Sequence, residues 1–64
     1  MDFSEEIRTA RLAKKLTQQE IADALELDRS TIAHYENGTG KPHFDNVRKL
    51  CELLDLTYEE IFNE

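Results

Sequence analysis

Apolar residues recur along most of the chain at the three- and four-residue spacing of helices that bury one face. Ile21 and Leu25 are four positions apart, and Ile32 and Tyr35 are three apart, so each pair forms an apolar stripe. Only the short segment ELD separates the two stretches. The pattern therefore predicts two short helices joined by a tight turn over residues 18–37, the arrangement called a helix-turn-helix.

Polar residues mark the ends of these two helices. Thr17, with Glu20 three residues later, has the sequence pattern of a capping box. Asp28 holds the matching place before the second helix, where we expect its carboxylate to accept a free backbone N–H. Asn37 and Gly38 should end the second helix, because glycine readily adopts the left-handed conformation that follows a last turn.

The flanking segments predict three more helices. Ser4 is expected to cap a helix over about residues 5–14, and another should start near His43 or Phe44. The core stripe of that later helix comprises Val47, Leu50, Cys51 and Leu54. A second capping box, Thr57 with Glu60, predicts a short fifth helix that turns Ile61 and Phe62 inward. The expected fold is all-α, with five helices in one domain over residues 1–64.

The charge of the chain is unusual for a nucleic-acid binder, since the net charge is −6. Residues 1–50 hold all eight Lys and Arg against nine acids, whereas residues 51–64 hold five acids and no base. The acidity is thus concentrated toward the C-terminal end. Any affinity for DNA is expected to be modest and salt-sensitive.

Several classes of function are disfavoured. His34, His43 and Cys51 lack the paired spacing of metal ligands, so we expect no metal. The chain has no glycine-rich phosphate loop and no nucleophile paired with a base, so neither an enzyme nor a cofactor is expected. A single cysteine on a core stripe fits a reducing cytoplasm, and no apolar run is long enough for a membrane span.

The chain resembles the Cro and phage-repressor-like helix-turn-helix proteins of the Xre family over roughly residues 7–62. The residues that carry the resemblance are Arg11, Leu16-Thr17-Gln18, Glu20-Ile21-Ala22, Leu27-Asp28, Thr31-Ile32, Tyr35-Glu36-Asn37-Gly38, Pro42, Leu50, Leu54, Leu56-Thr57 and Ile61-Phe62. The resemblance implies a lambda-repressor-like DNA-binding domain and a transcriptional regulator, in the first instance a repressor. It also implies a homodimer on a palindromic operator with half-sites about 34 Å apart.

The resemblance makes the helix from Arg29 the one that reads the major groove, and its outward positions are Arg29, Ser30, Ala33 and His34. Arg29 suits the two acceptors of guanine, Ala33 a thymine methyl group, and His34 a base acceptor or a phosphate. Phosphate contacts are expected from Gln18, Gln19, Thr31, Asn37 and Lys41.

Two scaffold features also follow from the resemblance. Arg11 lies among apolar positions of its helix, and its implied partner in a structural ion pair is Glu36. Relatives usually carry glycine where this chain has Lys15, Glu26 and Asp55. These positions close helices and tend to need a positive φ, which costs a non-glycine residue about 1 kcal/mol.

An alternative function is a protein-interaction module, such as an antitoxin-like partner or an adaptor. The acidic C-terminal end favours it, although such a surface also serves solubility alone. The outward positions of the second helix are polar, which suits a DNA groove better than a protein interface. Leu12, Leu53 and Phe62 are candidates for a dimer surface.

Overall fold

The computed structural model describes residues 3–57 and residue 59, and these hold four α-helices. The helices are α1 (Phe3–Ala13), α2 (Gln18–Leu25), α3 (Arg29–Asn37) and α4 (Phe44–Leu54). No strand occurs in this part of the chain, which confirms the all-α prediction. The predicted fifth helix, with Ile61 and Phe62, falls mostly outside the described residues.

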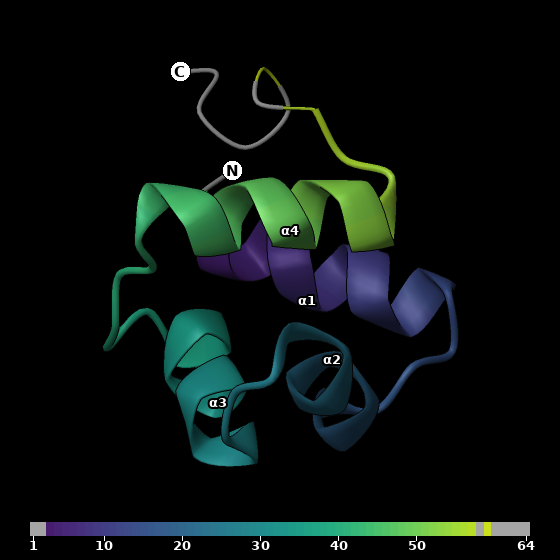
Figure 1. The fold of residues 1–64 in the computed structure, drawn as a ribbon. Helices are drawn as coiled ribbons and strands as arrows, with labels where there is room; N and C mark the ends of the chain where they lie inside the picture. The colour runs from purple at the N-terminus through teal and green to yellow at the C-terminus, as the bar shows by residue number, and fades with distance from the viewer. Residues whose placement is uncertain (1–2, 58, 60–64) are drawn as a thin grey trace.

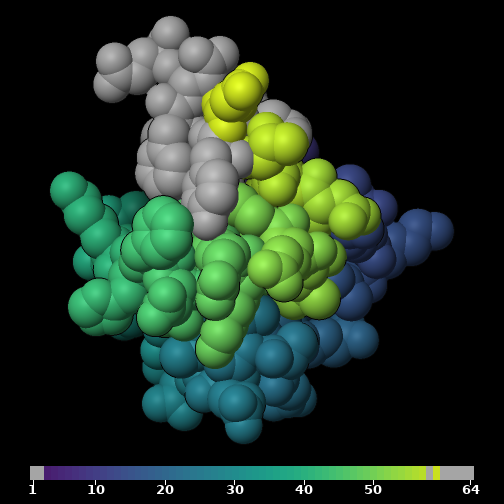
Figure 2. Space-filling model, turned by 45° about the horizontal axis from the view of Figure 1, so that its top comes forward, coloured from purple at the N-terminus to yellow at the C-terminus, as the bar shows by residue number. Residues whose placement is uncertain are grey.

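α1 and α4 lie side by side and form one side of the molecule, while α2 and α3 form the other (Figure 1). α3 packs against α1 and α2, and α4 packs against α1 and α2. Figure 2 shows the green atoms of α4 lying across the blue and teal atoms of the helix-turn-helix. The helix-turn-helix thus packs against α1 and α4 on its inner side. The opposite side of α3 faces solvent.

The core lies where the four helices meet. Its buried members are Ile7, Ile21, Ala22, Leu25, Ile32, Tyr35, Val47, Leu50, Cys51 and Leu54. Every residue of the predicted apolar stripes is among them, so the stripes are confirmed. Ala22 is fully buried, and its small side chain lets neighbouring helices approach closely. Leu27, in the turn between α2 and α3, packs against the same core.

The helix starts follow the predicted caps only in part. The capping box of α2 is complete, because Thr17 Oγ1 accepts the Glu20 N–H at 3.0 Å and Glu20 Oε1 accepts the Thr17 N–H at 2.8 Å. Asp28 precedes α3, but its side chain makes no cap hydrogen bond. The N–H of Thr31 instead bonds to the backbone carbonyl of Asp28 at 3.0 Å, so the expected donor is already satisfied.

The start of α1 also differs from the prediction. Ser4 lies inside the helix and is not its cap, because α1 includes Phe3. The Phe3 ring contacts the Tyr35 ring edge-on, with 6.5 Å between centroids. The helix thus begins two residues before the position that the polar pattern indicated.

All four helices end with the same backbone arrangement. One or two residues past the end of each described helix, the backbone adopts the left-handed conformation. The φ angles are 59° at Lys15, 59° at Glu26, 79° at Gly38 and 56° at Asp55. The N–H of the next residue bonds to the carbonyl five residues earlier, at 3.1, 2.8, 3.0 and 2.9 Å in chain order. The positive φ expected at the three non-glycine positions is therefore confirmed.

Candidate nucleic-acid interface

α3 keeps apolar side chains on one side and polar ones on the other. Ile32 and Tyr35 are 0% and 6% exposed, whereas Arg29, Ser30 and His34 are exposed. Ala33 is half-buried between these two groups. Positions 29, 30, 33 and 34 share one side of the helix, because they lie one turn apart. The structure thus brings the residues predicted to contact bases onto one polar surface, which we call the recognition face.

The residues predicted to contact phosphates have more varied surroundings. Gln18 Nε2 donates to Glu36 Oε1 at 3.1 Å, and Gln19 Nε2 donates to Asp23 Oδ1 at 2.8 Å. A glutamine amide carries two N–H groups, so one donor on each remains for a further acceptor. Asn37 and Lys41 are exposed and Thr31 is half-buried.

Arg11 and Glu36 form a bidentate ion pair beneath this surface. Arg11 Nε lies 2.7 Å from Glu36 Oε2, and Nη2 lies 3.1 Å from Oε1, with the side chains only 12% and 3% exposed. Arg11 Nη1 also donates to the Leu16 carbonyl at 2.9 Å. Together with the bond from Gln18, these contacts join α1, the start of α2 and the last turn of α3. The pair therefore fixes how the recognition face is presented.

The loop after α3 folds closely around His34. The His34 carbonyl accepts the N–H groups of Gly38, Thr39 and Gly40, the last two at 3.0 and 3.3 Å. A Cβ on Gly40 would lie 3.2 Å from the His34 Cβ, so the loop passes closer to His34 than most side chains allow. Thr39 Oγ1 lies 2.8 Å from His34 Nδ1. Sequence analysis did not single out Thr39; the glycines on both sides of it were the available signal.

The helix-turn-helix itself is acidic. Arg29 is the only lysine or arginine in residues 18–37, and the carboxylates there are Glu20, Asp23, Glu26, Asp28 and Glu36. Three of these carboxylates accept hydrogen bonds, from the capping box, from Gln19 and from Arg11. Long-range attraction to DNA is therefore weak here, and recognition depends on short-range contacts.

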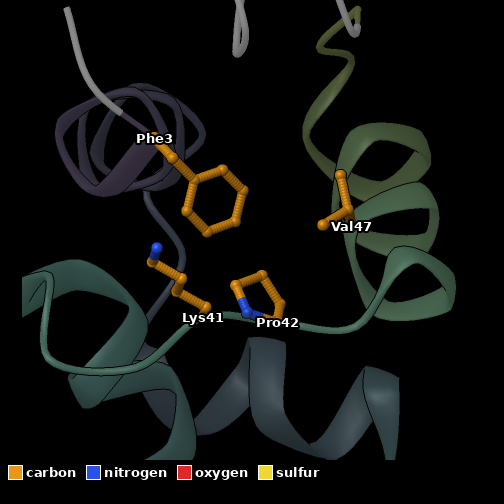
Figure 3. A pocket seen from close by; sticks show the side chains of 4 residues that line it. All are labelled: Phe3, Lys41, Pro42 and Val47. Atoms are coloured by element: carbon orange, nitrogen blue, oxygen red, sulfur yellow. The ribbon is translucent and has the colours of Figure 1, made fainter.

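An apolar cleft of about 300 Å³ borders the loop that carries Lys41. It is lined by Phe3, Lys41, Pro42 and Val47, and Figure 3 shows the Phe3 ring and the Val47 side chain on opposite sides of it. Lys41 is exposed overall, so its aliphatic part forms the wall while its ammonium group stays in water. The cleft thus lies between α1, α4 and the loop that follows α3.

Residues 3–57 and 59 contain neither a metal-site cluster nor a helix able to span a membrane. No group of three His, Cys, Asp or Glu side chains there is arranged to hold a metal ion. None of the described helices combines the length and the apolar character that crossing a bilayer requires. Cys51 is buried.

Comparison with known proteins gives a consistent result. The model of the helix-turn-helix family matches residues 7–61. The transcriptional activator BcrR of Enterococcus faecalis is 29% identical over 63 residues, which is 98% of this chain and 31% of that protein. The cryptic phage CTXphi repressor RstR of Vibrio cholerae is 31% identical over 62 residues, 97% of this chain and 56% of that protein. The chain thus spans 31% of the length of BcrR and 56% of the length of RstR.

A solved structure is similar over nearly its whole length. The restriction-modification controller protein C.AhdI from Aeromonas hydrophila superposes with a TM-score of 0.83 and is 35% identical. The match covers 94% of this chain and 91% of that one. The four described helices and the helix-turn-helix therefore have a known counterpart in three dimensions.

Proposed function

The chain belongs to the helix-turn-helix family, and from this premise we propose that it binds double-stranded DNA sequence-specifically and regulates transcription as a repressor. The observation that carries the proposal is the recognition face. Arg29, Ser30 and His34 are exposed on one side of α3, while Ile32 and Tyr35 hold its other side in the core. A polar helix surface of this kind fits the major groove.

Each residue of the recognition face has a chemical match on DNA. Arg29 can donate twice to guanine, whose O6 and N7 both accept, and Ser30 can bond to several base edges. Ala33 can contact a thymine methyl group, and its partial burial restricts it to such a shallow contact. His34, one turn later, can donate to a base or to a phosphate.

Backbone contacts would hold this helix in register. We assign them to Gln18, Gln19, Thr31, Asn37 and Lys41. Gln18 is best supported, because Glu36 orients its amide at the start of α2, where free backbone N–H groups favour an anion. Gln19 is the least supported, because Asp23 already accepts one of its N–H groups and places a carboxylate beside it.

A two-fold homodimer on a palindromic site is the arrangement that we propose on DNA. One recognition helix reads only a few base pairs, and two related copies place their helices about 34 Å apart, one helical turn. Among the described residues, the large apolar side chains most open to solvent are Leu12, 55% exposed, and Phe44, 69% exposed. Leu53, another candidate for a dimer surface, packs partly against the core, and Phe62 lies outside the described residues.

We propose repression and not activation because repression needs fewer contacts. A protein that occupies a promoter represses transcription without any further contact, whereas activation needs a surface that engages another protein. The similar proteins include a named activator and a named repressor, so a promoter–reporter assay must decide. Because the similar proteins named above come from bacteria, where the chromosome lies in the cytoplasm, we also propose a cytoplasmic location.

Selection from a pool of random duplexes tests the proposal, with binding then measured by fluorescence anisotropy at two salt concentrations. We expect a palindromic site whose affinity falls with salt, because each phosphate contact releases counterions. Arg29→Ala should weaken binding, whereas Arg8→Ala, at an exposed arginine of α1, should change it little. If no duplex binds above background at low salt, the proposal is wrong, and a protein partner becomes the leading alternative.

A further inference from the structure

Thr39, between the two glycines of the loop after α3, lies where it can fix the orientation of His34. Its Oγ1 is 2.8 Å from His34 Nδ1 and 3.4 Å from the carbonyl oxygen of the same residue. We propose that Thr39 is a positioning residue that holds the His34 ring with its Nε2–H outward, so that His34 reads a hydrogen-bond acceptor on DNA. The DNA part of this inference rests on the proposed function.

The direction of the hydrogen bond follows from the surroundings of the hydroxyl. A threonine hydroxyl has one hydrogen, and its candidate acceptors here are Nδ1 and the His34 carbonyl. That carbonyl already accepts the N–H groups of Gly38, Thr39 and Gly40 and is the more distant acceptor at 3.4 Å. We therefore assign the hydroxyl hydrogen to the 2.8 Å contact, in which Nδ1 accepts; the opposite direction, Nδ1–H donating to Oγ1, would place the ring hydrogen on Nδ1. A neutral imidazole that accepts at Nδ1 carries its hydrogen on Nε2.

The loop geometry keeps this arrangement in place. The Thr39 N–H is bonded to the His34 carbonyl at 3.0 Å, so the two backbones are tied together. Gly40 approaches so closely that a Cβ there would lie 3.2 Å from the His34 Cβ. The ring is therefore held from its Nδ1 edge, and the Nε2 edge is the one that remains for solvent or DNA.

A fixed Nε2–H restricts what His34 can recognise. In the major groove the acceptors are guanine O6 and N7, adenine N7 and thymine O4, whereas cytosine N4 and adenine N6 are donors. Protonation of the ring would add a hydrogen at Nδ1 and leave the one on Nε2, so the outward nitrogen donates in both states. A histidine without such a partner could present either a donor or an acceptor. Thr39 thus narrows the base preference at one position.

The first part of the test uses nitrogen NMR of the histidine rings in the free protein at about pH 8, where neutral imidazole predominates in general. The chain has two histidines, so His34→Ala assigns the signals. We expect the hydrogen on Nε2 and an Nδ1 signal displaced by the bond from Thr39. Thr39→Val, which keeps the shape but lacks the hydroxyl, should abolish the displacement, and Thr39→Ser should restore it. A hydrogen on Nδ1, or an Nδ1 signal unaffected by Thr39→Val, would overturn the proposal.

The second part uses the selected duplex and its single-base variants. Thr39→Val should reduce discrimination at one base pair by about fivefold, the typical effect of one hydrogen bond. The same substitution should have no such effect in a His34→Ala background. An equal effect in both backgrounds would show that Thr39 does not act through His34. If the wild type binds no duplex, the proposed function fails, while the NMR result still decides whether Thr39 orients His34.

Discussion

Three of the four described helices end by directing a leucine toward the core, whereas α3 ends by holding a side chain at the surface. The residue after the left-handed position is Leu16 for α1, Leu27 for α2 and Leu56 for α4, and each packs against the core. After α3 it is Thr39, which is exposed and contacts His34. The same backbone arrangement therefore serves packing in three places and the recognition face in one.

The residue with positive φ also differs between the end of α3 and the ends of the other three described helices. Gly38 ends α3 without strain, while Lys15, Glu26 and Asp55 end the other helices with a Cβ in an unfavourable conformation. The strain costs about 1 kcal/mol, and the partial burial of a leucine, whose full burial contributes about 1.5–3 kcal/mol, is large enough to offset it. A helix end that buries a leucine thus tolerates a non-glycine residue. The end of α3, which buries no leucine, has the glycine.

The largest loss of stability is expected at the ion pair that joins the end of α1 to the end of α3. Arg11 donates to both the Leu16 carbonyl after α1 and Glu36 in the last turn of α3. Glu36→Ala would leave the Arg11 charge buried without its partner and should lower the free energy of unfolding by about 3–5 kcal/mol. This loss approaches the whole stability of a small domain. Urea unfolding followed by circular dichroism measures it.

A control for Glu36→Ala is Asp55→Asn, at the exposed ion pair between Lys14 and Asp55, whose atoms are 2.6 Å apart. The two pairs have similar distances but very different burial. A loss in Glu36→Ala no larger than in this control would show that solvent screens both pairs alike.

The second prediction compares two residues in equivalent places. Leu27→Ala should lower the free energy of unfolding by about 1–3 kcal/mol, less than for a fully buried leucine because Leu27 is only partly buried. Thr39→Val should change it by no more than about 0.5 kcal/mol, because the side chain is exposed. Equal losses would mean that Thr39 serves packing, as the leucines do.

The third prediction replaces a non-glycine residue that has a positive φ with glycine. Glu26→Gly should raise the free energy of unfolding by about 1 kcal/mol, because it removes the strain at φ 59°. In a domain of this size, that gain raises the melting temperature by about 4–8 °C. Glu26→Ala removes the same charge but keeps the Cβ, so it should give no comparable gain. A similar gain in both variants would attribute the effect to charge.

The smallest effect is expected at the exposed ion pair. Lys14→Ala should cost less than about 1 kcal/mol, because the Lys14 and Asp55 side chains are 37% and 77% exposed and water screens their attraction. Added salt should reduce the difference between wild type and variant further. A loss close to that of Glu36→Ala would show that this pair, although exposed, also holds the helix ends together.

The fold was largely predictable from the sequence, because burial and capping leave local patterns. The apolar stripes through Ile21, Ile32 and Leu50 identified the core, and Thr17 with Glu20 identified the start of α2. The positive φ at Glu26 was predictable because relatives have glycine there. Asp28 failed as a side-chain cap because a backbone carbonyl took its donor, and a sequence pattern does not show that competition.

The candidate site was predictable in its residue types and less so in its contacts. The outward side of α3 follows from helix periodicity, as at Arg29 and His34. The bond from Gln18 to Glu36 joins α2 to α3, and the contact between Thr39 and His34 depends on how the loop after α3 turns back onto that helix. That loop passes so close to α3 that a Cβ on Gly40 would lie 3.2 Å from the His34 Cβ, which only the three-dimensional structure shows.

The most direct test of the recognition face compares Arg29→Ala with Lys41→Ala on the selected duplex and on a scrambled one. If α3 reads bases, Arg29→Ala should weaken binding to the selected duplex by about 1–3 kcal/mol and leave the scrambled duplex nearly unchanged. Lys41→Ala should weaken both duplexes alike and reduce the salt dependence by about one phosphate contact. Equal weakening of both duplexes by Arg29→Ala would contradict base reading by α3.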